Sequence, residues 1–133
     1  MDESDRELIT AARDAMENAY APYSAYPVGA AVRTADGATY AGCNVENANY
    51  SNSLHAEEVA IARAACQGDL ELVAVAVTNA ARDGLTPCGM CRQTLREFAD
   101  DDLRVVCDAG EDNVAVYTLG ELLPDAITRE HLE

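Results

Sequence analysis

The apolar positions at the start of the chain repeat with the period of a helix. These positions are Leu8, Ala12, Ala15, Met16 and Ala19. Ser4 and Glu7 form an S-x-x-E sequence just before them, which is typical of a helix N-terminus. Pro22 and Pro27 then predict that the helix ends before the loop APYSAYPVG. The chain is therefore expected to open with one amphipathic helix.

Several later segments have the pattern of strands. Asp36 and Gly37 separate two β-favouring runs, which predicts a hairpin. Residues 72–78 form a continuous apolar run, as expected for a strand buried on both faces of a sheet. The segments LRVVCD and VAVYTL predict two more strands. Five strands are therefore expected.

Three further helices complete the predicted order. One covers about residues 54–66, with Ile61, Ala62 and Ala65 facing the core; a second begins in TPCGMCRQ, and a short one lies around residues 121–123. Helices alternate with single strands or strand pairs, and this order favours an α/β fold with one mixed five-stranded sheet and helices on its faces. A chain of 133 residues fits one domain, residues 1–133.

Composition narrows the cellular setting. The longest apolar runs, such as LVAVAV, are too short to cross a bilayer, so no membrane is expected as a partner. The first residues, MDESDRELIT, lack the basic and apolar stretches of a signal peptide. Five cysteines, an odd number, favour a reducing compartment. We therefore expect a cytoplasmic protein.

The charge of the chain is strongly negative. The net charge is −15, and all nine basic residues are arginines. This balance disfavours a nucleic acid as partner, because binding a phosphate backbone requires basic residues to neutralise it. An acidic chain without lysine is also typical of proteins that work in high salt, which screens the self-repulsion. The alternative is codon bias towards arginine, although that bias does not by itself require the excess of Asp and Glu.

Cys88 and Cys91 form a C-x-x-C pair at a predicted helix start. This spacing is compatible with a thioredoxin-like redox pair, a structural zinc site or a catalytic zinc site. A structural site needs a fourth ligand, and the other three cysteines, Cys43, Cys66 and Cys107, stand alone and are expected to be small buried apolar residues. A catalytic site needs only three protein ligands and leaves one position for water.

His55 can supply the third ligand. It begins one predicted helix and the cysteines begin another, so both positive helix ends can point to one place, where they favour thiolates. Zn²⁺ with two thiolates and one neutral imidazole carries no net charge. Glu57, two residues after His55, then lies beside the water as a proton carrier. The sequences HAE and PCGMC together match the H-x-E and P-C-x-x-C signature of zinc deaminases.

Neighbouring stretches closely resemble the small homotetrameric cytidine deaminases. The resemblance runs through AYAPYSAYPVGAAV, GCNVENANYS, HAEEVAI, PCGMCRQ and ELLPDAI and covers about residues 19–127. It implies a three-layer α/β/α sandwich, one Zn²⁺ per subunit, and hydrolytic deamination of the free nucleosides cytidine and deoxycytidine in pyrimidine salvage. It also implies a homotetramer in which neighbouring subunits complete each active site.

The resemblance assigns substrate-binding roles residue by residue. It implies that Asn44 and Glu46 hydrogen-bond the sugar hydroxyls and that the backbone of Ala56 contacts the base. Tyr26 stands where the family usually has a base-stacking Phe, and its hydroxyl needs a wet or bonded position. Tyr50 matches a residue that reaches towards a neighbouring subunit's site.

Three positions depart from the usual tetrameric pattern. His55 replaces a cysteine ligand, Glu58 replaces an arginine, and Ile127 replaces a Phe that is often contributed across the subunit interface. The first two changes agree with each other, because a third thiolate would add a negative charge for an arginine to balance. Arg92, with Gln93 beside it, is expected to support the site by bonding a thiolate.

Other functions remain open on the sequence. A blasticidin-type aminonucleoside deaminase has a similar C-terminal half, although NVENANYS suits a ribose. A deoxycytidylate deaminase would need basic residues for the phosphate. A non-catalytic zinc module would be indifferent to Glu57, and a C-x-x-C oxidoreductase would bind no metal.

Overall fold

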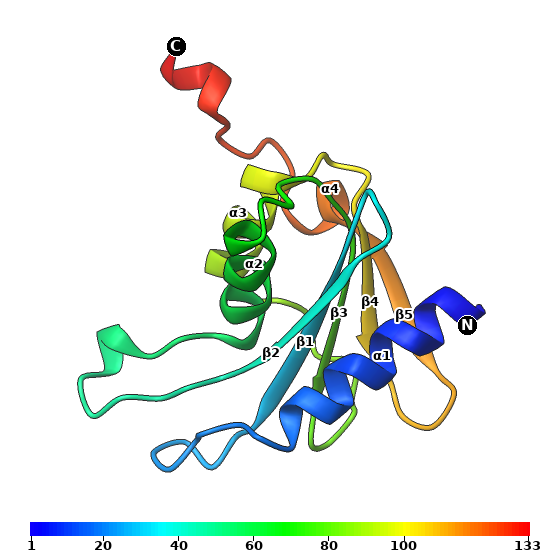
Figure 1. Ribbon diagram of the computed structural model, residues 1–133, viewed down its shortest axis with the longest axis vertical. Coiled ribbons are helices and arrows are strands. Elements are labelled where there is room, and N and C mark those ends of the chain that lie inside the picture. Colours follow the sequence, from blue (N-terminus) through cyan, green and yellow to red (C-terminus); the bar gives the residue numbers. More distant parts are fainter.

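The computed structural model describes residues 1–133, and its helices and strands follow the predicted order (Figure 1). The helices are α1 (Glu3–Met16), α2 (Ala56–Cys66), α3 (Gly89–Phe98) and α4 (Leu119–Leu122). The strands are β1 (Val28–Thr34), β2 (Thr39–Cys43), β3 (Leu72–Asn79), β4 (Arg104–Asp108) and β5 (Val114–Thr118). Two short 3₁₀ helices, η1 (Tyr50–Asn52) and η2 (Arg129–Leu132), complete the chain.

The five strands form one mixed sheet in the order β2-β1-β3-β4-β5. Strands β3 and β4 are parallel, and the other neighbours are antiparallel. The hairpin predicted at Asp36 and Gly37 joins β1 to β2. Strand β3 lies in the centre and is buried along almost its whole length, as its continuous apolar run predicted.

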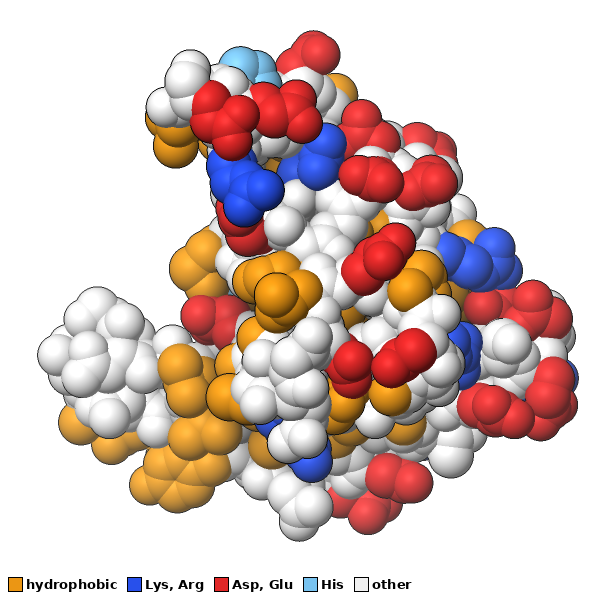
Figure 2. Space-filling model, turned by 45° about the horizontal axis from the view of Figure 1, so that its top comes forward, with side chains coloured by type: hydrophobic (Ala, Val, Ile, Leu, Met, Phe, Trp, Pro, Cys, Tyr) orange, Lys and Arg blue, Asp and Glu red, His pale blue; other side chains and the backbone are white.

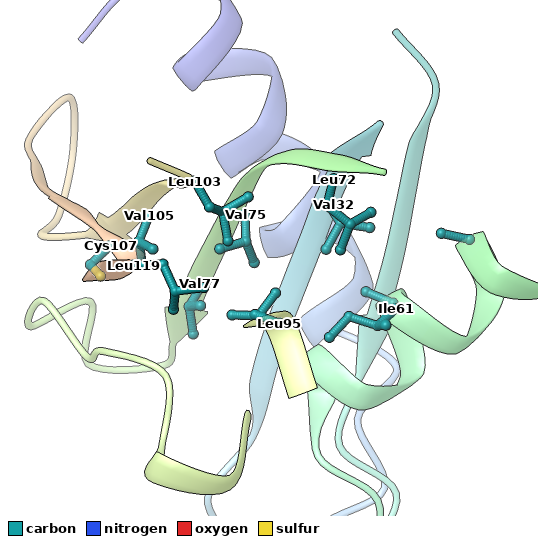
Figure 3. Close-up of a cluster of buried hydrophobic side chains, with 12 residues drawn as sticks. Val32, Ile61, Leu72, Val75, Val77, Leu95, Leu103, Val105, Cys107 and Leu119 are labelled. Atoms are coloured by element: carbon teal, nitrogen blue, oxygen red, sulfur yellow. The ribbon is translucent and has the colours of Figure 1, made fainter. Parts of the chain in front are cut away.

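Helices cover both faces of the sheet, which confirms the α/β/α sandwich (Figure 1). Helix α1 packs Leu8, Ile9 and Ala12 on one face. On the other face, Ile61 of α2 and Leu95 of α3 point into a cluster of apolar side chains from the strands (Figure 3). The cluster includes Val32, Val75, Val77 and Val105. Both cores consist of aliphatic side chains, as expected for a chain with few aromatic residues.

Two glycines set how closely the helices approach the sheet. A Cβ atom on Gly29 would lie 2.0 Å from the Ala12 carbonyl oxygen of α1. A Cβ atom on Gly42 would lie 2.7 Å from the Ala60 nitrogen and 2.8 Å from the Ala56 oxygen of α2. No side chain fits at either position, so the N-terminal turn of α2 rests directly on β2.

Several details of the sequence prediction were wrong. The N-cap of α1 is Asp2, whose side chain accepts a hydrogen bond from the Asp5 backbone N–H, and Ser4 lies inside the helix. After the first turn of α2 the buried positions are Ala60, Ile61 and Ala64, whereas Ala62 is exposed and Ala65 half-buried. The prediction placed the core-facing stripe of α2 one residue too late.

The start of one short helix and the burial of two cysteines also differ from the prediction. Helix α4 covers Leu119–Leu122, two residues earlier than the predicted start, because Thr118 and Glu121 form its capping box. Cys107 is buried as expected, but Cys43 is half-buried and Cys66 is exposed at the end of α2. All five cysteines are free thiols.

Two segments extend from the layered body (Figure 1). Residues 44–55, between β2 and α2, project as an arm that carries η1, and the C-terminal segment with η2 extends from another end. The arm exposes Val45, Tyr50 and Leu54. No helix combines the length and the apolar character that a membrane crossing would require.

Candidate metal centre and adjoining cavity

Two helix starts bring three ligating side chains together. His55 is the N-cap of α2, Cys88 is the N-cap of α3, and Cys91 lies in the first turn of α3. The Nδ1 atom of His55 lies 3.2 Å from the Sγ atom of Cys88 and 3.3 Å from that of Cys91. The two helix N-termini therefore meet at one place, as the sequence predicted.

The three side chains can hold a metal ion, because their ligand atoms all lie within 4.8 Å of one another. Zinc binds cysteine sulfur at about 2.3 Å and histidine nitrogen at about 2.0–2.1 Å, so tetrahedral ligands lie about 3.5 Å apart. The observed nitrogen–sulfur distances of 3.2 and 3.3 Å are close to that value. One imidazole and two thiols form the set of a catalytic zinc site with an open fourth position.

The surroundings of Cys91 require a cation for its thiolate form. Burial, and next the negative charge of Glu57, raises the pKa of the Cys91 thiol well above its usual value. Only the deprotonated thiol binds a metal. The N-terminus of α3 favours the thiolate but does not offset the burial. A divalent cation held by His55, Cys88 and Cys91 would supply the missing positive charge.

Glu57 occupies the position expected of a proton carrier. Its side chain is only 5% exposed and lies in the wall of the same cavity as His55 and Cys88. Burial raises the pKa of the Glu57 carboxyl, and this effect exceeds the lowering by its own backbone N–H and by His55. A raised pKa makes it easier for a carboxyl group to hold a proton before returning it.

Glu58 has a structural contact of its own. Its Oε1 atom accepts a hydrogen bond of 2.8 Å from the His55 backbone N–H. This bond satisfies a free donor at the start of α2, and the negative charge lies at the positive end of the helix. Glu58 thus fixes the backbone that carries the imidazole.

A cavity of about 620 Å³ adjoins the cluster. Its lining includes every residue predicted to bind the substrate: Tyr26, Asn44, Glu46, Tyr50 and Ala56. Sequence reasoning missed Tyr23, Leu85 and Thr86, which also line it. Leu85 and Thr86 directly precede the P-C-x-x-C sequence, and this adjacency was the only available signal for them.

Asn44 and Glu46 are already held in place by hydrogen bonds. Asn44 Oδ1 accepts from the Val28 backbone N–H, and its Nδ2 donates to the Tyr26 carbonyl. Glu46 accepts from the backbone N–H groups of Tyr23 and Ser24 and from the Ser24 hydroxyl. The Ser24 hydroxyl, together with these N–H groups, lowers the pKa of Glu46, so this residue is an ionised acceptor at neutral pH. Asn44 keeps one N–H free to donate.

Arg92 and Gln93 make contacts that the sequence did not predict. Arg92 donates to the carbonyls of Pro87 and Leu122 and to the Thr86 hydroxyl, and it bonds neither thiol. The expected thiolate bond is therefore wrong, because Arg92 instead fixes the turn that leads into Cys88. Gln93 Nε2 donates to the Ile127 carbonyl at 3.0 Å and so tethers the C-terminal segment.

Tyr50 and Ile127 both lie on the projecting segments. Tyr50 is 73% exposed on the arm, and its ring meets the ring of Tyr23 edge-on at 5.9 Å. Ile127 is also exposed. Within this chain, the Ile127 side chain does not line the cavity, whereas Tyr50 does.

Comparison with known proteins identifies the family. The model of the cytidine and deoxycytidylate deaminase zinc-binding region matches residues 2–107, which include the three ligating residues and Glu57. The chain belongs to the cytidine and deoxycytidylate deaminase family.

Relatives and solved structures match over most of the chain. A cytidine deaminase from Sporosarcina psychrophila is 38% identical over 94% of this chain and 92% of its own length. A cytidine deaminase from Halalkalibacterium halodurans is 39% identical over 94% of this chain and 95% of its own length. The crystal structure of a Burkholderia pseudomallei cytidine deaminase superposes with a TM-score of 0.87 at 42% identity, over 96% of this chain and all of that one. Fold and family therefore agree, and the family's zinc-binding region coincides with the cluster of His55, Cys88 and Cys91.

Proposed function

We propose that this protein is a zinc-dependent hydrolase that deaminates free cytidine and deoxycytidine, releasing ammonia, in pyrimidine salvage. The observation that carries the proposal is the juxtaposition of His55, Cys88 and Cys91 with the buried Glu57 in the wall of one cavity. Relatives that cover nearly the whole chain are cytidine deaminases, which favours this function over a blasticidin-type aminonucleoside deaminase.

One zinc ion per chain would be held by His55, Cys88 and Cys91. When bound, zinc supplies Lewis acidity that lowers the pKa of a water molecule towards neutrality. The backbone around the ligands is set by Glu58 at the first helix and by Arg92 at the second.

Glu57 moves the protons of the reaction. Its carboxylate takes a proton from the attacking water and delivers it to N3 of the cytosine ring while oxygen adds to C4. It then takes the remaining proton from the new C4 hydroxyl and passes it to the amino group, so that the C4–N bond breaks, the C4 carbonyl of uridine forms and ammonia leaves. The burial that raises the Glu57 pKa suits a group that must alternate between the two protonation states.

The cavity provides complementary groups for a nucleoside. Asn44 donates its free N–H to a sugar hydroxyl, and the ionised carboxylate of Glu46 accepts hydrogen bonds from the sugar hydroxyls. The backbone of Ala56 contacts the base, and Tyr26 stacks on it. No arginine lines this cavity, which favours an uncharged nucleoside over a nucleotide phosphate. The net charge of −15 likewise disfavours a polynucleotide.

The proposal includes a single domain, residues 1–133, assembled as a cytoplasmic homotetramer whose subunits complete each other's sites. The arm supports the assembly, because Val45, Tyr50 and Leu54 expose apolar surface beside the cavity. Five free thiols support a reducing compartment.

The test is an assay on the purified protein with its metal. Zinc per chain is measured by elemental analysis, and cytidine, deoxycytidine and blasticidin S are compared by the ultraviolet change on deamination. Turnover of the two pyrimidine nucleosides with about one zinc per chain is expected. Turnover of blasticidin S alone, or zinc without any turnover, would overturn the proposed substrate class. Light scattering would test the tetramer separately.

A further inference from the structure

Asn79 lies at the end of β3, outside the cavity lining, and is only 1% exposed. Its Nδ2 atom donates two hydrogen bonds, one of 2.8 Å to the Tyr26 hydroxyl oxygen and one of 3.0 Å to Asp83 Oδ1. Tyr26 lines the cavity, whereas Asp83 belongs to the loop that leads from β3 to Cys88. One buried amide thus joins two parts of the site.

Asp83 fixes the orientation of this amide. An ionised carboxylate only accepts hydrogen bonds, so the nitrogen of the Asn79 amide must face Asp83 and, with it, the Tyr26 hydroxyl. The Oδ1 atom of Asn79 is consequently buried without a hydrogen-bond partner. Both hydrogen bonds of the Asn79 side chain are therefore made through its nitrogen, one of them to the Tyr26 hydroxyl.

Tyr26 is held from its backbone as well as from its hydroxyl. Its N–H donates to Ser24 Oγ at 3.1 Å, and its carbonyl accepts from Asn44 Nδ2 at 2.9 Å. The preceding residue, Ala25, has a φ of 55°, a left-handed conformation that is strained for a residue other than glycine. The backbone of Tyr26 is therefore fixed by hydrogen bonds through both its N–H and its carbonyl.

We propose that Asn79 is a positioning residue that holds the Tyr26 ring in the orientation that stacks on the pyrimidine base. This inference rests on the proposed function, in which Tyr26 lines the base-binding part of the cavity. Asn79 acts through the tyrosine hydroxyl and does not touch the substrate. A phenylalanine at position 26 would stack but could not be held in this way, so Asn79 and Tyr26 form a functional pair.

The test is a double-mutant cycle with Tyr26→Phe, Asn79→Ala and the double variant. Steady-state KM and kcat for cytidine are measured, with zinc content and thermal unfolding for each protein. Each single variant is expected to raise KM about 2- to 10-fold, the change that corresponds to one lost hydrogen bond, with kcat within about 2-fold. The double variant should match Asn79→Ala, because Tyr26→Phe removes only the bond to the tyrosine hydroxyl, which is already absent in Asn79→Ala. Asn79→Ala also loses the bond to Asp83, so the comparison with that variant isolates the hydroxyl contact. Asn18→Ala, an exposed asparagine without side-chain hydrogen bonds, is the matched control.

Several results would overturn the inference. An unchanged KM in Tyr26→Phe, or multiplicative effects in the double variant, would show that the hydroxyl contact does not position the ring. A purely structural role would lower the unfolding temperature of Asn79→Ala and leave KM unchanged. If Asn79→Ala does not fold, Tyr26→Phe decides alone, because Asn79 is the only hydrogen-bond partner of that hydroxyl. Absence of cytidine turnover in the unmodified enzyme would instead refute the proposed function.

Discussion

The Nδ1 atom of His55 lies 3.2 Å from the Sγ atom of Cys88, although 33 residues separate them in the chain. Each residue is the N-cap of its own helix, α2 or α3, and both helices cover the same face of the sheet. The metal centre is therefore a product of helix placement on that face.

Replacement of a ligand tests the metal centre. Cys88→Ser is expected to reduce zinc below about one tenth of an ion per chain and to abolish turnover, because a serine hydroxyl is a poor zinc ligand. Elemental analysis and the cytidine assay measure the two effects. Cys66→Ser, at an exposed cysteine far along α2, is the control and should retain full zinc. Full zinc in Cys88→Ser would contradict the assigned ligand set.

Replacement of Glu57 separates proton transfer from metal binding. Glu57→Gln keeps the size of the side chain but cannot carry a proton, so kcat should fall by about 10²- to 10⁴-fold while zinc remains bound. The measurements are the rate of uridine formation at saturating cytidine and the zinc content per chain. Turnover that persists, or zinc that is lost, would argue against this role.

A buried ion pair predicts the response to acid. Burial alone would raise the pKa of Asp108, but hydrogen bonds from Arg13, Thr78 and the Gly110 N–H, with the charge of Arg13, outweigh it and lower that pKa. Arg82 adds a weaker contact at 3.9 Å. Because the folded-state pKa lies below the unfolded value of about 3.9, the pair contributes fully above that pH. Its stability is lost as the pH falls through the lower folded value.

Arg13→Ala should therefore lower the free energy of unfolding at pH 7 by about 3 kcal/mol, because it removes the close cationic partner of a fully buried carboxylate and leaves only Arg82 at 3.9 Å. The difference from the unmodified protein should shrink as the pH falls below about 4, where Asp108 becomes protonated. Urea unfolding across this pH range measures both effects. Arg6→Ala, also on α1, breaks an exposed pair with Asp112 and should cost at most about 1 kcal/mol. Equal losses of unfolding free energy in Arg13→Ala and Arg6→Ala would contradict a larger contribution from the buried pair than from the exposed one.

The contact at Gly42 predicts a steric effect on the site. Gly42→Ala places a methyl group within 3 Å of the Ala56 oxygen and the Ala60 nitrogen, so α2 must shift away from β2. We expect a loss of about 1–3 kcal/mol in unfolding free energy and a lower kcat/KM, since Ala56 and His55 move with the helix. The control is Gly89→Ala. No atom lies within 4 Å of the Cβ that this substitution adds, so the free energy of unfolding should stay unchanged or rise slightly. Thermal unfolding of both variants provides the comparison.

The acidic surface predicts stabilisation by salt. Asp and Glu side chains spread over the face in Figure 2 with few arginines among them, and the chain has 24 acidic residues against nine basic ones. Raising KCl from 0.1 to 2 M should raise the unfolding temperature by several degrees, with most of the gain complete by about 1 M, where the Debye length is about 3 Å. A temperature that is independent of salt would contradict adaptation to high salt.

The sequence alone determined the order of the elements and the buried central strand, and it predicted the cluster of His55, Cys88 and Cys91 that the fold brings together. These features depend on local properties: hydrophobic period, turn residues and the spacing within HAE and PCGMC. The start of α3 was likewise readable from the C-x-x-C sequence, whereas α1 ends at Met16, three residues before Ala19, the last of its predicted helical positions. Even the stripe of α2 was misplaced by only one residue.

Tertiary structure decided the contacts between distant segments. Arg92 donates to the Leu122 carbonyl, 30 residues away, which lies within its reach only in the folded chain. In the same way, the amide that holds the Tyr26 hydroxyl comes from Asn79, 53 residues away at the end of β3. No periodicity encodes such pairs, because they depend on how α3 lies against α4 and how the end of β3 lies against the loop before β1 in the folded chain.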